Sequence, residues 1–290
     1  MAMITGSSCD NATSPINITS TATKCTSICK YKYKYAISDC VLTNGGDYLG
    51  IQATQKGNNV YFNNAIYNVV GARVYTPSLH TYNGTHADGE LIIDHVGGGN
   101  NLLVCIPIKV SGSASTGGSS FFHSFLPYVP QKKGGVANVN VANWSFNSII
   151  PPGKYYFYNG TAPYPPCTGA YNIIVFDSDK AVNVSSTAFA HLTAVIKKNT
   201  ITTKAIPTGG LFVNPTGAAD SADSDDIFID CQPVLTPGAE PSNLKQNKQG
   251  GKNKPKGFDS LLSSPALAII LGIALITLLK KIYSAFLDYI

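Results

Sequence analysis

"YYFYNGTAPYPPCTGAYNIIVF", residues 155–176, combines two apolar runs with a Gly- and Pro-rich segment between them. Val, Ile, Tyr and Phe favour β-strands, whereas Gly, Pro and Asn interrupt them, so the stretch predicts strands at Tyr155–Tyr158 and Tyr171–Phe176. Runs of the same kind predict further strands at Val60–Val70, Glu90–Val96 and Leu102–Val110. The sequence therefore predicts a sheet protein.

Helical patterns are scarce along the chain. One short helix is predicted at Ser186–Lys197, where Ser185 or Ser186 can cap an apolar Ala/Phe/Leu/Val pattern. The chain of 290 residues, 44% of them hydrophobic, is long enough to bury a sizeable core.

The C-terminal part of the chain has a different composition. Leu261–Leu279 contains no charged residue, and a helix with a rise of about 1.5 Å per residue spans a hydrocarbon core over this length. The segment before it is rich in Pro, Gly, Asn and Lys, which is typical of a flexible linker. We therefore predict a head (1–236), a basic linker (237–260), a transmembrane helix (261–279) and a short tail (280–290).

The two ends of the chain predict the membrane topology. The first ten residues, MAMITGSSCD, lack the positive segment and apolar run of a secretory signal. Lysines are more numerous before the span than after it, which predicts that the head stays on the cytosolic side of a tail-anchored protein. The six Asn-X-Ser/Thr sequons are then ordinary strand and turn sequence.

The net charge of +5 is unevenly distributed. Residues 1–244 contain 14 basic and 14 acidic side chains, whereas residues 245–290 contain 7 basic and 2 acidic ones. A lysine cluster beside a membrane span indicates contact with lipid headgroups, so no nucleic-acid partner is expected.

The stretch at 155–176 resembles the signature of the α-carbonic anhydrases, in which a tyrosine-rich strand, a Gly-containing turn, Pro-Pro-Cys-Thr and an apolar strand follow in that order. SPINI (14–18) resembles that family's N-terminal motif, and LTNGGDYLGI (42–51) resembles its Asn-Gly-containing strand. Residues 66–96 match, without gaps, the stretch that carries the family's metal-ligating histidines. The resemblance implies a mostly β (α+β) head, with a central, mostly antiparallel sheet of about ten strands and short peripheral helices.

In this register the three metal-ligating histidines correspond to Tyr67, Val69 and Ile92. Val and Ile have no donor atom, whereas a catalytic zinc ion needs three imidazoles or comparable donors and an open position for water. The family's hydroxide-orienting threonine corresponds to Pro163, and its proton-shuttle histidine corresponds to Gly46. The resemblance therefore implies a degenerate carbonic anhydrase fold that has no zinc, no other cofactor and no catalytic activity.

Two residues of the surrounding frame match the family. His80 and Glu90 occupy positions that hydrogen-bond to each other behind the metal site in the family. The five histidines do not have the spacing of another ligand set, and no Gly-X-Ser-X-Gly turn predicts a hydrolase.

Seven cysteines are many for a head that faces the cytosol. Cys9 and Cys167 match a pair that forms a disulfide in extracellular members of the family, so the resemblance implies that bond. Cys105 lies in an apolar run and is expected to be a buried thiol. The pairing of Cys25, Cys29, Cys40, Cys105 and Cys231 stays open.

The sequence KYKYKY, residues 30–35, alternates charge and aromaticity. In a strand, Lys30, Lys32 and Lys34 lie on one face about 7 Å apart, and the tyrosines point to the other face and into the core. We call these three lysines the lysine ladder. One interpretation is a solvated face that deters edge pairing. The other is an anion-binding surface for a sulfated glycan or an acidic capsid neighbour.

The order of parts resembles that of the carbonic-anhydrase-like cell-surface-binding proteins of poxvirus virions. Large cytoplasmic DNA viruses oxidise virion proteins in the host cytosol, which suits a disulfide-bonded head without a signal sequence. We expect a non-catalytic, tail-anchored protein of the virion membrane with an attachment role, on host cytoplasmic-side membranes during assembly. The alternatives are a minor capsid protein that links the capsid shell to the inner membrane, and an active carbonic anhydrase.

Overall fold

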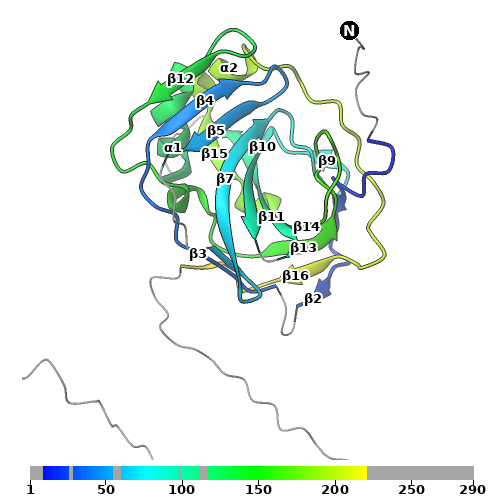
Figure 1. Ribbon diagram of the computed structural model, residues 1–290. Coiled ribbons are helices and arrows are strands. Elements are labelled where there is room, and N and C mark those ends of the chain that lie inside the picture. The colour runs from blue at the N-terminus through cyan, green and yellow to red at the C-terminus, as the bar shows by residue number, and fades with distance from the viewer. Residues whose placement is uncertain (1–8, 26–28, 55–59, 98, 112–116, 221–290) are drawn as a thin grey trace, which may run out of the picture. The chain divides into compact units, whose positions relative to one another are not determined.

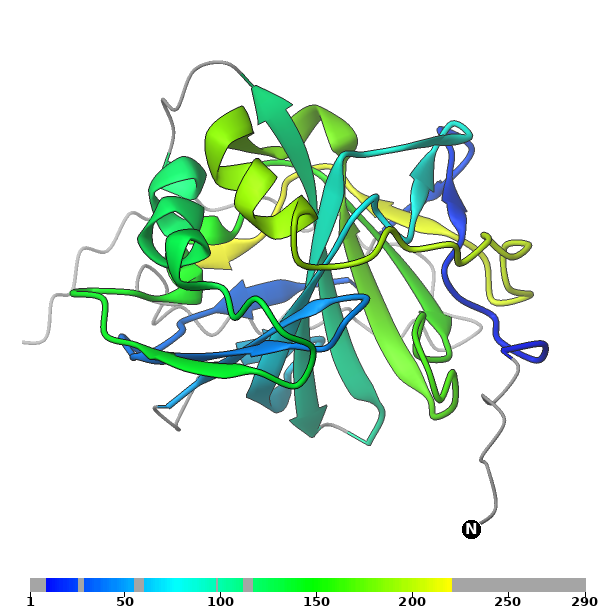
Figure 2. The same cartoon turned by 90° about the horizontal axis from the view of Figure 1, so that it is seen from above.

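The computed structural model describes residues 9–25, 29–54, 60–97, 99–111 and 117–220. Within these ranges the chain forms one large sheet with short helices beside it, and one small sheet (Figures 1 and 2). The predicted linker, transmembrane helix and tail lie outside the described residues. No helix inside these ranges is long and apolar enough to cross a bilayer.

Ten described strands form the continuous path of the large sheet. In order across it they are β12 (Val136–Val139), β4 (Cys40–Asn44), β5 (Leu49–Ala53), β7 (Ala65–Tyr75), β10 (Gly89–Gly97), β11 (Asn101–Ser111), β14 (Tyr171–Phe176), β13 (Tyr155–Gly160), β16 (Phe212–Asn214) and β2 (Thr23–Lys24). Along this path β11 pairs in parallel with β14, and β16 with β2, while the other neighbours are antiparallel. The prediction of a mostly antiparallel central sheet is confirmed.

Shorter strands extend the large sheet and form the small one. β15 (Val182–Ser185) pairs with β11, and β3 (Tyr31–Tyr33) lies between β6 (Val60–Phe62) and β17 (Ala219–Asp220). The small sheet has the order β1 (Asn17–Ile18), β8 (Thr81–Tyr82) and β9 (Thr85–His86).

The run Val60–Val70, predicted as one strand, is a hairpin in the structure. β6 ends at Phe62 and β7 begins at Ala65, and Asn63 and Asn64 between them have φ angles of 50° and 67°. Positive φ at both central residues is the requirement of a two-residue hairpin turn, and asparagine adopts it more readily than most residues. The apolar character of the run concealed this turn.

The helices are short and lie beside the sheet (Figure 2). In α2 (Ser186–Thr193) the Ser185 side chain accepts a hydrogen bond from the backbone N–H of Ala188, which confirms the predicted cap. The helix ends before the predicted Lys197. The sequence did not indicate α1 (Gly117–Phe125), because Gly and Ser are poor helix formers. The 3₁₀ turns are η1 (Leu126–Tyr128), η2 (Phe146–Ile149) and η3 (Ser178–Lys180).

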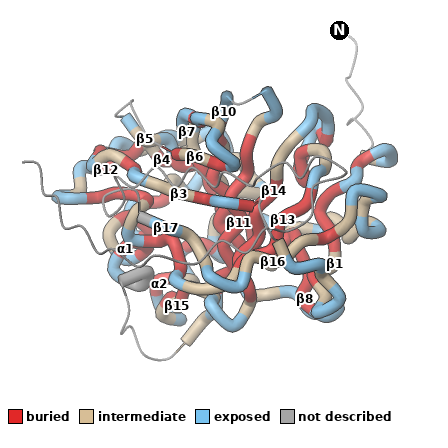
Figure 3. The backbone as a smooth tube through the Cα atoms, turned by 90° about the horizontal axis from the view of Figure 1, so that it is seen from below, coloured by how far each residue is buried: buried red, intermediate tan, exposed pale blue. Residues whose placement is uncertain are grey.

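Two apolar clusters hold the head together, and the central strands are the most buried part of the chain (Figure 3). The larger cluster contains Phe121 and Phe122 of α1 and Leu192 of α2. The second, which we call the Ile92 cluster, contains Ile92 of β10 and Leu79. Because side chains alternate along a strand, the central strands contribute to both clusters.

Candidate functional site

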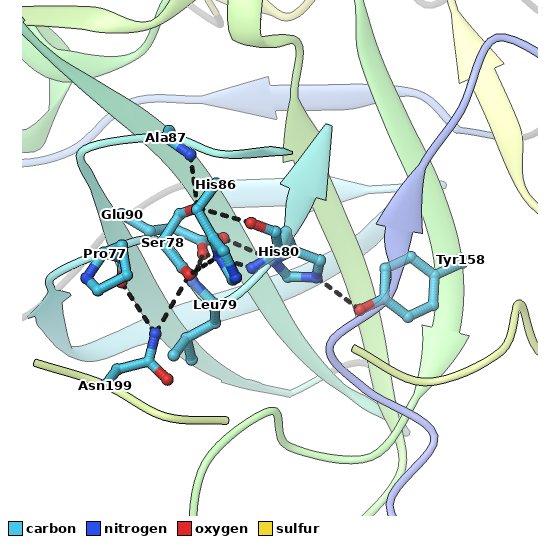
Figure 4. A network of polar contacts seen from close by, with 9 residues as sticks. All are labelled: Pro77, Ser78, Leu79, His80, His86, Ala87, Glu90, Tyr158 and Asn199. Carbon is cyan, nitrogen blue, oxygen red and sulfur yellow. Dashed lines mark hydrogen bonds and ion pairs between the residues drawn. The ribbon is translucent and has the colours of Figure 1, made fainter. Parts of the chain in front are cut away.

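A buried polar network connects three elements of the head (Figure 4). Nδ1 of His80 lies 2.6 Å from Oε1 of Glu90 in β10, and Nε2 of His80 lies 2.7 Å from the hydroxyl group of Tyr158 in β13. The backbone N–H groups of Leu79 and His80 donate to Oε2 of Glu90 at 2.6 and 3.0 Å. The contact between His80 and Glu90 that the resemblance implied is therefore present.

Burial and hydrogen bonding act in opposite directions on Glu90. Burial by itself would raise its pKa, but the His80 side chain and the two backbone N–H groups hold the pKa of Glu90 below its ordinary value. Glu90 is therefore a carboxylate that the network holds in its ionised form.

Cys105 of β11 completes a group of three potential metal ligands with His80 and Glu90. Their donor atoms lie within 4.8 Å of one another, and all three residues are buried. Burial, together with the charge of Glu90, raises the pKa of Cys105 well above its ordinary value, so the residue is a neutral thiol. Both ring nitrogens of His80 already have partners, and a metal ion would have to displace them. The group fits a hydrogen-bonded structural network better than a metal site.

Ile92 occupies the position that the resemblance assigns to the third metal-ligating histidine. It is fully buried in the Ile92 cluster. Directly across the sheet it pairs with Arg73 of β7 on one side and with Cys105 of β11 on the other. Residues paired across strands point to the same face, so Arg73 is the β7 residue nearest to the Ile92 side chain.

Tyr67 and Val69 do not lie near Ile92, which corrects the predicted register. Tyr67 pairs with Gly97, five residues from Ile92, which is roughly 16 Å along the sheet at about 3.3 Å per residue. Two ligands of one zinc ion lie within roughly 4 Å of each other, because each is about 2 Å from the metal. Tyr67 and Val69 also pack against the larger apolar cluster, on the other side of the sheet.

A β-bulge accounts for this change of side. Asp94 pairs with Gly71, but the next residue of β10, His95, pairs with Val69, so β7 has one extra residue at Val70. An extra residue reverses which side chains face which side of the sheet beyond it. The gapless count along the sequence contains no information on this cross-strand register.

Arg73 lies in a cluster of charged and aromatic side chains that the sequence reasoning missed. Its Nη1 lies 3.1 Å from Oδ2 of Asp94, and its guanidinium carbon lies 4.0 Å from the ring centroid of Tyr164 and 5.5 Å from that of Tyr48. The hydroxyl group of Tyr164 donates to Asp94, and the rings of Tyr75 and Tyr164 are stacked. We call Arg73, Asp94, Tyr164, Tyr48 and Tyr75 the Arg73 cluster.

The Arg73 cluster is only partly shielded from solvent. The Arg73 side chain is 31% exposed and the Asp94 side chain 16% exposed. Burial raises the pKa of Asp94, while Arg73 and the hydrogen bond from Tyr164 offset part of that effect. A charged residue within the apolar run of β7 was the available signal in the sequence, since buried charges are nearly always paired.

Pro163 and Gly46 are the two residues that the resemblance assigned to the other catalytic positions. Pro163 is buried directly before Tyr164, and it has neither a hydroxyl group nor an N–H group. Gly46 lies in the turn between β4 and β5 with φ of 97°, and its carbonyl oxygen accepts a hydrogen bond from the backbone N–H of Lys197. Without a side chain, Gly46 cannot transfer a proton.

The tyrosines of the KYKYKY stretch point inward as expected at two positions. Tyr31 and Tyr35 are buried, and their hydroxyl groups lie 2.8 Å apart. The Tyr35 hydroxyl group is also 2.8 Å from Nε2 of His95. Burial lowers the pKa of His95 to about 4, so this histidine is an uncharged partner at neutral pH.

The lysine ladder is less regular than predicted. Lys30 and Lys34 are exposed, whereas Lys32 is half-buried. Strand β3 has β6 on one side and β17 on the other, so within the described residues it is not an edge strand. The interpretation that these lysines prevent edge pairing is therefore wrong.

Two disulfides are formed in the described part of the chain. Cys9 is bonded to Cys167, as the resemblance implied, and Cys25 is bonded to Cys29. Cys40 and Cys105 are free and buried, which agrees with the expectation for Cys105. Cys231 lies outside the described residues.

Comparison with solved structures places the head among α-carbonic anhydrase folds. The enzyme from Thermovibrio ammonificans is similar with a TM-score of 0.62 at 20% identity, over 70% of this chain and 87% of that chain. The Photobacterium profundum enzyme has a TM-score of 0.61 at 18% identity, over 69% of this chain and 88% of that chain. Dioscorin complexed with ascorbate has a TM-score of 0.58 at 20% identity, over 71% of this chain and 86% of that chain. No family profile and no curated protein sequence matches the chain. At these identities the comparisons show the fold.

Proposed function

We propose that this protein is a non-catalytic binding protein built on the α-carbonic anhydrase fold. The observation that carries the proposal is the pairing of Ile92 with Arg73. At the position of the third metal ligand the chain has an apolar side chain, and directly opposite it has a cation that is held by Asp94 and by tyrosine rings. A guanidinium group cannot ligate zinc, because it has no lone-pair donor and repels a second cation.

The first prediction is that the purified full-length chain, in detergent, binds much less than one zinc ion per chain and does not accelerate carbon dioxide hydration. The physical reason is that Ile92 has no donor atom and that the Arg73 cation is paired with it on β7, in the place where a metal ion would need a ligand. Metal content is measured by mass spectrometry after dialysis against zinc, and hydration by stopped-flow pH change.

An active α-carbonic anhydrase, measured in the same buffers, is the positive control. Stoichiometric zinc, or hydration activity that a chelator abolishes, would contradict the proposal and favour the active enzyme instead.

We further propose that the head is the attachment module of a tail-anchored virion membrane protein of a large DNA virus. The apolar segment Leu261–Leu279 and the lysines before it support the membrane anchor. Two disulfides in such a head support an oxidising assembly pathway. The partners proposed for the lysine ladder are a sulfated glycan or, for a minor capsid protein, a capsid neighbour.

The second prediction is that changing Lys30, Lys32 and Lys34 to serine weakens binding to heparin or chondroitin sulfate by about tenfold or more at low salt, with a smaller effect at high salt. Exposed charges are screened over about 8 Å at physiological ionic strength, so contacts with an anion lose strength as salt is added. Binding is measured at two salt concentrations, together with incorporation of the protein into virions.

A matched control changes three exposed lysines elsewhere, Lys132, Lys197 and Lys198, to serine, which removes the same charge. Loss of glycan binding only in the ladder variant supports attachment, whereas loss of virion incorporation alone supports the capsid role. Equal behaviour of the two triple variants contradicts a specific role of the ladder.

A further inference from the structure

A pocket of about 390 Å³ opens beside the small sheet. It is lined by Asn17 of β1, Thr81 of β8, Gly84, His86 of β9 and the segment 199–203. It shares no residue with the Arg73 cluster or with the lysine ladder. Its volume lies in the range of about 300–1,000 Å³ that is typical of small-molecule sites.

The hydrogen-bonding groups on one side of the pocket have fixed orientations. Oδ1 of Asn17 accepts from the Thr81 hydroxyl group at 2.9 Å and from the backbone N–H of Gly84 at 2.8 Å. These two donors identify which end of the amide is the oxygen. Asn17 lines the pocket, and its Nδ2 group, which neither contact uses, is a hydrogen-bond donor.

Two other lining residues, His86 and Asn199, are tied to the buried network through Ser78 (Figure 4). Nδ1 of His86 lies 2.7 Å from the carbonyl oxygen of Ser78, and Nδ2 of Asn199 donates to the same oxygen at 3.2 Å. A carbonyl oxygen only accepts, so Nδ1 of His86 carries the proton, and in the neutral ring Nε2 is an acceptor. Oδ1 of Asn199 accepts from the backbone N–H of Ile201 at 2.7 Å, which holds the start of the segment 199–203 in place.

The chemistry of the lining is neutral and rich in hydroxyl groups. None of the described residues that line it is Asp, Glu, Lys or Arg. Thr200, Thr202 and Thr203 add hydroxyl groups that both donate and accept, and Ile201 adds one apolar side chain. An ionic ligand would find no opposite charge here, whereas a sugar ring has hydroxyl groups at its edge and C–H groups on its face.

We propose that this pocket binds a neutral saccharide unit. The ring lies with a C–H face toward Ile201, and its hydroxyl groups exchange hydrogen bonds with Asn17, His86 and the threonines of 199–203. The proposal goes beyond the function proposed above, because it depends neither on the loss of zinc nor on the lysine ladder. Because Ser78 also donates to the carbonyl oxygen of His80 at 2.6 Å, the pocket wall is continuous with the rigid core of the head.

The test is saturation-transfer NMR on the full-length chain in detergent with glucose, galactose, mannose and N-acetylglucosamine as probes. At least one sugar is expected to receive magnetisation. Its binding is expected to weaken about tenfold or more when Thr200, Thr202 and Thr203 are changed to valine, which keeps the branched shape of threonine without its hydroxyl group. His86→Ala, which removes one acceptor, is expected to weaken it about fivefold.

A matched control changes three exposed threonines outside the pocket, Thr23, Thr168 and Thr208, to valine and is expected to bind as the wild type does. Thermal unfolding of each variant distinguishes a loss of binding from a loss of folding. No transfer to any of the four sugars, or unchanged binding in the pocket variants, overturns the proposal. Zinc content and heparin binding of the same samples test the proposed function separately.

Discussion

Replacing Glu90 by alanine is expected to lower the free energy of unfolding of the head by about 3–5 kcal/mol, because it removes one partner of a buried charged network. The Glu90 carboxylate is fully buried and is in contact with Nδ1 of His80 and two backbone N–H groups. After the change these donors have no acceptor and no access to water, and the cavity left behind adds to the loss.

The effect is measured as a fall in the melting temperature, monitored by circular dichroism. With a sensitivity of about 2–4 °C per kcal/mol for a domain of this size, the expected fall is roughly 6–20 °C. Glu90→Gln keeps the size and one acceptor, so its loss is expected to be smaller, about 1–3 kcal/mol. The control is Asp47→Ala, at an exposed carboxylate, which is expected to change little. A loss for Glu90→Ala as small as that of the control would show that the network does not stabilise the fold.

Removal of the disulfide Cys9–Cys167 by double substitution with serine is expected to destabilise the head by about 2–5 kcal/mol. The bond joins residues 158 positions apart, so it removes a large part of the conformational freedom of the unfolded chain. It also ties the N-terminal segment before β1 to the turn between β13 and β14. The measurement is denaturant unfolding of the double variant and of the wild type under oxidising conditions.

The second disulfide is the matched control. Cys25 and Cys29 are four positions apart, so their disulfide closes a much shorter loop than Cys9–Cys167 does. In the loop-closure description, closing the longer loop stabilises the folded state by about 3 kcal/mol more than closing the shorter one. Substitution of Cys25 and Cys29 by serine is therefore expected to have the smaller effect. Equal losses for the two double variants would contradict this explanation and indicate that local packing decides both.

Local patterns in the sequence were sufficient for much of the fold. The apolar, β-branched and aromatic runs around Pro165 and Pro166 became β13 and β14, and the serine before an apolar run became the cap of α2. These features depend on residues that are near one another in the chain, where side-chain periodicity and turn chemistry act directly. The disulfide between Cys9 and Cys167 and the contact between His80 and Glu90 were available only through the family resemblance.

What the tertiary structure alone decided is which residues meet across strands. Ile92 pairs with Arg73, and the bulge at Val70 turns Tyr67 and Val69 to the other side of the sheet; no pattern along β7 reveals either feature. A shift of one residue moves every following side chain to the other side of a sheet, so a small error in register changes the whole composition of a site. The sequence by itself determined that the chain is a sheet protein, with strands at residues 155–158 and 171–176. The Arg73 cluster exists because the fold brings together Arg73 of β7, Asp94 of β10 and Tyr164 of the turn between β13 and β14. Charged groups that are partly buried there are stable only when they are paired.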